Sequence, residues 1–116
     1  MENYIIRDLR KEMIKHFLDI IVMNNIKLRG PLSGYDIIET VQSEFNLMMS
    51  PGSVYSLLYC LERQGLLSGE FTDQKRVFRL TDKGEEHIKT VVQSKEEILK
   101  FARVILENNQ SYPSST

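Results

Sequence analysis

The stretch SPGSVYSLLYCLERQGLL, residues 50–67, has a marked start, an apolar stripe and a marked end. Ser50 can accept a hydrogen bond from a free N–H group of a first helical turn, and Pro51 fits the first helical position. Gly65 can take the positive φ angle with which helices commonly end. The sequence therefore predicts a helix over residues 51–64.

Apolar residues of this helix recur at i, i+3, i+4 and i+7, which predicts that one face packs against a core. These residues are Val54, Leu57, Leu58 and Leu61. At about 100° per residue, Ser56, Tyr59 and Arg63 point the opposite way, with Ser53 on one flank. Hydroxyl and guanidinium groups suit phosphates and base edges, whereas a plain surface helix with unusual residues is the alternative.

Two helices are predicted before this segment. Apolar periodicity predicts a long helix over residues 5–26 that is apolar on two sides, and Gly30 with Pro31 breaks it. Ser33 can cap a second helix, and Asp36 completes a variant of the capping box. Two short helices joined by a tight turn form a helix-turn-helix.

A hairpin and a long helix are predicted after it. Residues 66–72 and 75–81 form the strands, and the turn at residues 73–74 lacks the glycine that tight hairpins prefer. The last helix covers residues 82–108. The predicted fold class is mainly α (α+β), a winged helix-turn-helix with a two-stranded wing and a long C-terminal dimerisation helix. The expected organisation is a DNA-binding winged helix-turn-helix at 1–81, a dimerisation helix at 82–109 and a frayed tail at 110–116.

Three cations give the hairpin the character of a DNA-binding wing: Lys75, Arg76 and Arg79. Lys75 and Arg76 lie at the predicted tip, where a wing meets the DNA backbone or the minor groove. With Arg63 they supply about three phosphate contacts per subunit and about six per dimer, which predicts a slope of log K against log salt near −5.

Composition excludes several classes of protein. The chain has 116 residues, enough for one small domain that a partner subunit would help to bury. Its net charge of −1 gives no global sign of nucleic-acid binding. No apolar run is long enough to span a bilayer, and the N-terminus lacks signal-peptide features, so we expect a soluble cytoplasmic protein.

No catalytic or metal-binding pattern is present in the sequence. His16 and His87 stand without Cys or acidic residues at ligand spacing. Cys60 is the only cysteine, so it forms no intramolecular disulfide and is more simply an inert side chain than a sensor. No nucleophile–base set or phosphate-binding glycine loop is visible. We therefore expect no enzyme activity, no metal site and no cofactor.

Apolar pairs at positions 91/92, 98/99 and 105/106 repeat every seven residues, as in a helix–helix seam. A monomer would expose this band as a large patch, so the sequence predicts a two-fold dimer in which the last helix packs on its mate and on the partner's first helix. Such a dimer places two recognition helices about 34 Å apart on a near-palindromic site. The predicted interface residues are Phe17, Ile21, Val91, Ile98, Leu99, Ala102, Ile105 and Leu106.

Three stretches of the chain resemble the PadR-type transcriptional regulators. They are GPLSGYDII at residues 30–38, SPGSVYSLLYCLERQGLL at residues 50–67 and RLTDKGEEHI at residues 79–88. The C-terminal part is similar to the smaller PadR subgroup, in which one final helix serves dimerisation. The resemblance implies a homodimeric, usually repressing DNA-binding protein, sometimes released by a small-molecule effector. Phe17 and Phe101 could line an effector pocket or belong to the core.

The resemblance also implies functional positions. They are Gly34 and Tyr35 at the start of the second helix, Ser50, Pro51, Gly52 and Tyr55 at the start of the recognition helix, and Arg79 and Thr81 at the end of the wing. Where family members often have basic residues within the recognition helix, this chain has Tyr59 and Cys60. Tyr35 and Tyr55 either contact phosphates or pack half-buried with one hydroxyl partner each.

Two functions from different classes therefore remain: a dimeric DNA-binding repressor and a winged helix used as a protein-interaction module. The acidic second helix, with Asp36, Glu39 and Glu44, favours the second, because these side chains would oppose a phosphate backbone that they faced. A steep dependence of DNA binding on salt would favour the first. The residues predicted to bind DNA are Tyr35, Ser50, Gly52, Ser53, Tyr55, Ser56, Tyr59, Arg63, Lys75, Arg76 and Arg79.

Overall fold

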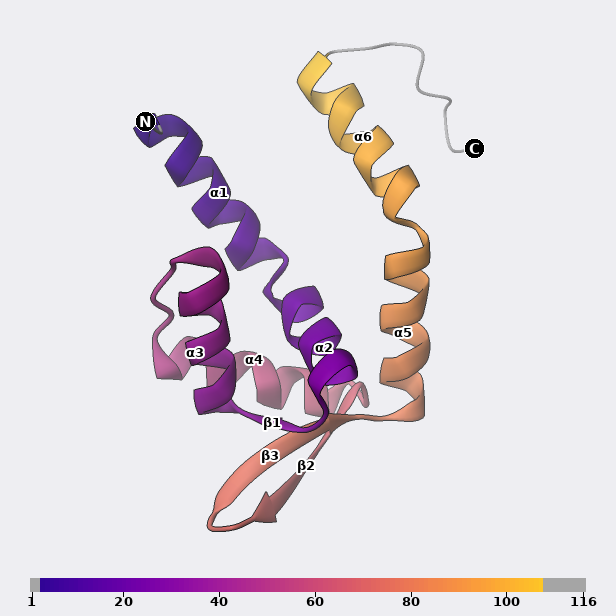
Figure 1. Ribbon diagram of the computed structural model, residues 1–116. Helices are drawn as coiled ribbons and strands as arrows, with labels where there is room; N and C mark the ends of the chain where they lie inside the picture. The colour runs from indigo at the N-terminus through magenta and orange to yellow at the C-terminus, as the bar shows by residue number, and fades with distance from the viewer. Residues whose placement is uncertain (1–2, 108–116) are drawn as a thin grey trace.

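The computed structural model describes residues 3–107, which form six helices and one three-stranded antiparallel sheet (Figure 1). In chain order the elements are α1 (Tyr4–His16), α2 (Leu18–Arg29), β1 (Leu32–Ser33), α3 (Gly34–Phe45), α4 (Pro51–Arg63), β2 (Leu67–Thr72), β3 (Lys75–Leu80), α5 (Asp82–Gln93) and α6 (Lys95–Glu107). The predicted winged helix-turn-helix is confirmed. The tail predicted at 110–116 lies outside the described residues.

Serine caps begin α3 and α4, as predicted. The Ser33 hydroxyl accepts a hydrogen bond from the Asp36 N–H at 3.1 Å, and the Asp36 carboxylate accepts one from the Ser33 N–H at 2.9 Å. This reciprocal pair is a complete capping box. The Ser50 hydroxyl accepts a hydrogen bond from the Ser53 N–H at 3.2 Å, with proline at the first helical position. Gly65, with φ of 79°, follows the end of α4.

The N-terminal helix predicted to be continuous is interrupted at Phe17, whose φ of −99° and ψ of 13° separate α1 from α2. Asp19 lies in the first turn of α2, where a carboxylate suits the positive end of a helix dipole. The continuous apolar periodicity across residues 5–26 concealed this sign of a second helix start. The side chains that α2 buries are Leu18, Val22, Met23 and Ile26, whereas α1 buries none.

Strands β2 and β3 form the predicted hairpin, and each residue from 67 to 72 pairs across it. Asp73 and Gln74 make the turn with φ angles of 48° and 64°. Two-residue hairpin turns of this kind require positive φ at both positions, so these two residues adopt it without a glycine. The wing is therefore a tight ribbon.

A third strand was not predicted. The two residues of β1 pair with β3, Leu32 opposite Phe78 and Ser33 opposite Val77, which gives the strand order β1-β3-β2. Two residues are too few to show a strand period, so the sequence pattern could not reveal this strand. Its effect is to join the start of α3 directly to the wing.

The buried core lies where α2, α3, α4 and α5 meet the sheet. Its most buried large side chains are Val22, Met23, Ile37, Val41, Val54, Leu58, Leu67, Phe78 and Ile88. Of the predicted apolar stripe of α4, Leu57 is only partly buried and the other three residues are buried. The stripe therefore holds α4 in place and leaves its opposite face to solvent.

The predicted C-terminal helix is also divided. Ser94 separates α5 from α6, and its hydroxyl donates to the Thr90 carbonyl at 2.8 Å, a kind of bond that often bends helices. The α5 helix packs against α2, where Lys27 pairs with Glu85 at 2.9 Å, whereas α6 buries no residue. In Figure 1, α1 and α6 extend as two arms from the same side of the core.

Candidate nucleic-acid interface

The polar face of α4 is open to solvent, with Ser53, Ser56 and Arg63 exposed. The Ser50 hydroxyl donates to Ser53 Oγ at 2.9 Å, so the hydroxyls of the first turn are linked. Arg63 makes no ion pair within residues 3–107, so neither Glu62 nor Glu44 neutralises it. This face therefore offers hydroxyls and one unpaired guanidinium to a ligand.

The first turns of α3 and α4 meet through Gly34 and Tyr55. A Cβ atom at position 34 would lie 2.4 Å from Cζ of Tyr55, so the tyrosine ring occupies the space that a side chain would need. Tyr55 is partly buried in this contact, which favours the packing interpretation for it. Tyr35 is 65% exposed and remains available on the surface.

Gly52 lies in the first turn of α4 and differs from Gly34. A Cβ atom added there would meet no other atom within 4 Å. The fold of the single chain therefore does not require glycine at this position. Open space above a backbone without a side chain permits close approach by another backbone.

Tyr59 is 39% exposed and belongs to a row of aromatic rings. Its centroid lies 6.2 Å from that of Tyr55 and 6.0 Å from that of Phe78, with an edge-to-face arrangement at Phe78. These contacts connect α4 to β3. The predicted base-reading tyrosine is therefore also a packing residue at the base of the wing.

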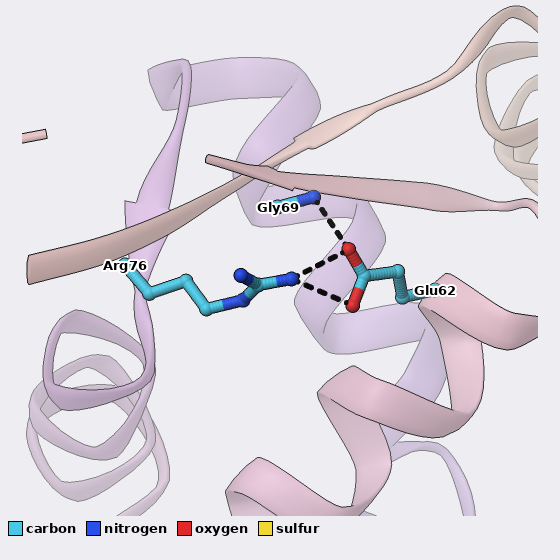
Figure 2. A network of polar contacts seen from close by, with 3 residues as sticks. All are labelled: Glu62, Gly69 and Arg76. Carbon is cyan, nitrogen blue, oxygen red and sulfur yellow. Dashed lines mark hydrogen bonds and ion pairs between the residues drawn. The ribbon is translucent and has the colours of Figure 1, made fainter. Parts of the chain in front are cut away.

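The cations of the wing have different surroundings. Lys75 is exposed at the turn, whereas Arg79 pairs with Glu70 on the neighbouring strand. Arg76 turns back toward α4 and pairs with Glu62 at 2.7 Å (Figure 2). Of these three wing cations, only Lys75 makes no ion pair in the part of the chain that the structure describes.

Glu62 was not among the predicted site residues, although it lies within the motif. The Gly69 N–H donates to its carboxylate at 3.0 Å. This hydrogen bond is the main cause that holds the pKa of Glu62 below its ordinary value, and the Arg76 guanidinium adds to the effect. The hairpin register brings Gly69 and Arg76 near each other, and the packing of the hairpin on α4 brings both to Glu62, so spacing along the sequence did not reveal the group.

The residues predicted for a dimer interface lie mostly on the two arms. Phe17 is exposed, as are Phe101 and the apolar residues at 98, 99, 105 and 106 on α6. Ile21, Val91 and Ala102 are partly buried within the single chain. The α1 arm also exposes apolar side chains that the prediction omitted, namely Ile6, Leu9 and Met13.

A surface hollow of about 560 Å³ lies between the α1–α2 junction and α4. His16, Asp19, Ser53 and Cys60 are among its lining residues, and Gln64 donates to the Cys60 Sγ at 3.5 Å. Within residues 3–107 no group of three or more His, Cys, Asp or Glu side chains could hold a metal ion. No helix in that range is long and apolar enough to cross a membrane.

Comparisons with known proteins agree with this geometry. The chain is 29% identical over 83 residues to the transcriptional activator GvpE2 of Halobacterium salinarum, covering 70% of this chain and 43% of that protein. It thus spans less than half the length of this curated relative.

Two solved structures share the fold. A PadR family transcriptional regulator from Eggerthella lenta has a TM-score of 0.73 at 24% identity, covering 90% of this chain and 95% of that one. Bacillus subtilis PadR in complex with operator DNA has a TM-score of 0.59 at 24% identity, covering 65% of this chain and 46% of that one.

The family of this chain follows from a match over more than half of its length. Residues 22–90 match the description "Transcriptional regulator PadR-like family". This range runs from α2 through the first part of α5 and includes all three motifs that carried the resemblance. The chain belongs to the transcriptional regulator PadR-like family.

Proposed function

We propose that this protein is a homodimeric, cytoplasmic transcriptional regulator that binds a near-palindromic DNA site through α4 and the wing. The observation that carries the proposal is the exposed polar face of α4, which is held rigidly by the buried stripe on its opposite side. The structure of Bacillus subtilis PadR with operator DNA, which shares the fold, supports it.

In this proposal α4 lies in the major groove. The hydroxyls of Ser53 and Ser56 face base edges, while Arg63 and Lys75 contact phosphates. The open space at Gly52 accommodates the DNA backbone near the start of the helix. Arg63 and Lys75 thus give about two phosphate contacts per subunit and about four per dimer.

The first prediction concerns the salt dependence of DNA binding. About four contacts give a slope of log K against log salt of about −4, shallower than the value of about −5 expected if Arg76 also contacted phosphate. Lys75→Ala should reduce the steepness by about 2, because each subunit loses one contact. Fluorescence anisotropy with a labelled duplex measures the slope.

Lys89→Ala on α5 is the matched control, since it removes an exposed lysine that belongs neither to α4 nor to the wing. Its slope should equal that of the wild type. A wild-type affinity that does not change with salt would contradict DNA binding. It would favour the protein-interaction module, with Glu39 and Glu44 exposed on α3 for a basic partner.

We further propose that the regulator represses, as the PadR resemblance implies. The curated relative is named an activator, so the direction of regulation needs its own test. A reporter gene placed behind the selected DNA site should fall in expression when the protein is present, and a rise would reverse this part of the proposal. An effector would enter at the dimer interface, where Phe17 and Phe101 are exposed.

A further inference from the structure

Glu62 holds two strands of the wing with one carboxylate. Gly69 of β2 donates its N–H to Oε2 at 3.0 Å. Arg76 of β3 donates from Nη2 to both oxygens, at 2.9 Å and 2.7 Å. Figure 2 shows the guanidinium directed at the carboxylate, which projects from α4. The recognition helix and the wing are thus joined by three hydrogen bonds to a charged group.

The guanidinium of Arg76 is enclosed on further sides. A Cβ atom at position 69 would lie 2.7–2.9 Å from three of its atoms, so the absence of a side chain at Gly69 makes room for it. The Cζ of Arg76 lies 5.7 Å from the ring centroid of Tyr59 and 5.4 Å from that of Phe78, within cation–π range. Its Nε is buried and has no hydrogen-bond partner among the described residues.

This environment differs from that of a phosphate-binding arginine. Such a side chain keeps its fork of N–H groups free for the ligand. Here the same Nη2 atom donates to both carboxylate oxygens, and the stem is bent back over the sheet toward α4. Lys75, the preceding residue, is exposed at the turn and carries a charge that is free to meet a backbone.

We propose that Arg76 and Glu62 are positioning residues that set the angle of the wing relative to α4, and that Arg76 is not itself a phosphate ligand. The inference rests on the proposed DNA-binding function. A correctly angled wing lets Lys75 reach the phosphate backbone while the polar face of α4 lies in the groove. Glu62 therefore contributes to DNA affinity although its own charge repels DNA.

The test compares Glu62→Gln, Arg76→Gln and the double variant. The probe is the duplex that the wild-type protein selects from a random pool, and affinity is measured over a range of salt. Each single variant should weaken binding about five- to tenfold, and the double variant should be no weaker than either, because the two side chains act as one unit. The salt slope should become shallower by up to about 2 in all three variants, because Lys75 then no longer reaches the backbone.

Direct phosphate contact by Arg76 makes opposite predictions. Glu62→Gln would then tighten binding, because it removes a repelling charge and frees a cation. Arg76→Gln would make the salt slope shallower by about 2 for a dimer, whereas Glu62→Gln would keep the slope of the wild type. Either result for Glu62→Gln overturns the inference. A wild-type protein that binds no duplex would instead overturn the proposed function itself, so the two failures are distinguishable.

Arg76→Lys separates positioning from phosphate contact. It keeps the charge but loses the planar fork, so positioning predicts weakened DNA binding whereas a phosphate contact predicts near wild-type affinity. The NMR shift of the Gly69 amide reports the contact without DNA. It should move in Glu62→Gln while circular dichroism is unchanged, and an unchanged shift would show that the carboxylate does not hold the wing.

Discussion

At the residue scale, two glycines of the family motifs, Gly34 and Gly84, mark places where two elements approach closely. Gly34 lies under the Tyr55 ring, and a Cβ atom at Gly84 would lie 2.1 Å from the Leu66 carbonyl oxygen. Near Gly84, Thr81 Oγ1 accepts from the Gly84 N–H at 3.0 Å and donates to the Gly65 carbonyl at 2.5 Å. These contacts explain in physical terms why glycine stands in the GY sequence at 34–35 and in the LTDKG sequence at 80–84.

Two alanine substitutions should separate folding from binding. Gly34→Ala should destabilise the protein by about 1–3 kcal/mol, because its methyl group displaces the Tyr55 ring. Gly52→Ala should stabilise the protein by about 0.4–1 kcal/mol, since the methyl group meets open space at a helical position, but should lower DNA affinity if a backbone approaches there. Thermal unfolding and anisotropy measure both effects. Equal DNA affinity for Gly52→Ala and the wild type would exclude close approach at that position.

At the scale of elements, each short helix of the helix-turn-helix depends on its own cap. The capping box of α3 joins Asp36 to Ser33, which is also the second residue of β1. The Ser33 N–H is the main cause that lowers the pKa of Asp36, with the Ser33 hydroxyl adding to it and partial burial opposing it. Ionised Asp36 therefore stabilises the start of α3.

This lowered pKa predicts a dependence of stability on pH. Because the folded-state pKa lies below the unfolded one, the contribution of Asp36 is complete well above pH 4 and is lost as pH falls through the folded-state pKa. Asp36→Asn should cost about 0.5–1 kcal/mol at pH 7, and much less at a pH below the folded-state pKa of Asp36. Urea unfolding at the two pH values tests this. A difference that persists at low pH would mean that the carboxylate charge is not the cause.

Local signals explain what the sequence could predict. The caps at Ser33 and Ser50 and the hairpin around residues 73–74 depend on neighbouring residues, and all were found. The interruptions at Phe17 and Ser94 fall within continuous apolar patterns, so periodicity concealed them. The pairing of Arg76 with Glu62 depends on how β3 docks on α4, and no spacing along the chain encodes that contact.

At the scale of the whole molecule, the described chain is more extended than a compact domain. Its radius of gyration is 16.2 Å, whereas a compact chain of this length has about 13 Å. The excess comes from α1 and α6, which bury no residues and expose apolar side chains (Figure 1). A second copy of the chain that covers both arms is the partner that we propose for this surface.

Leu99→Asp tests this assembly. Leu99 is 61% exposed in the single chain, so the substitution should disturb the monomer little. In a dimer it would bury an unpaired carboxylate in each subunit, at a cost of several kcal/mol. Sedimentation at micromolar concentration should show a monomer, with loss of affinity for full DNA sites.

Lys100→Asp also introduces a carboxylate, on the side of α6 away from the apolar residues at 98, 102 and 105, and serves as the control. It should sediment as the wild type does. A Leu99→Asp protein that remains dimeric would remove this face of α6 from the interface.

The two-residue strand β1 has a consequence for how the protein unfolds locally. Because β1 pairs with β3, the wing cannot separate from the body without also freeing the start of α3. The contacts between residues 32 and 78 cross much of the chain, so both ends of the helix-turn-helix should open in one cooperative event. In hydrogen exchange, the central amides of β3 should then share one opening free energy with the core amides of α3. The wing, which we propose to contact DNA, would then open together with the fold and not separately from it.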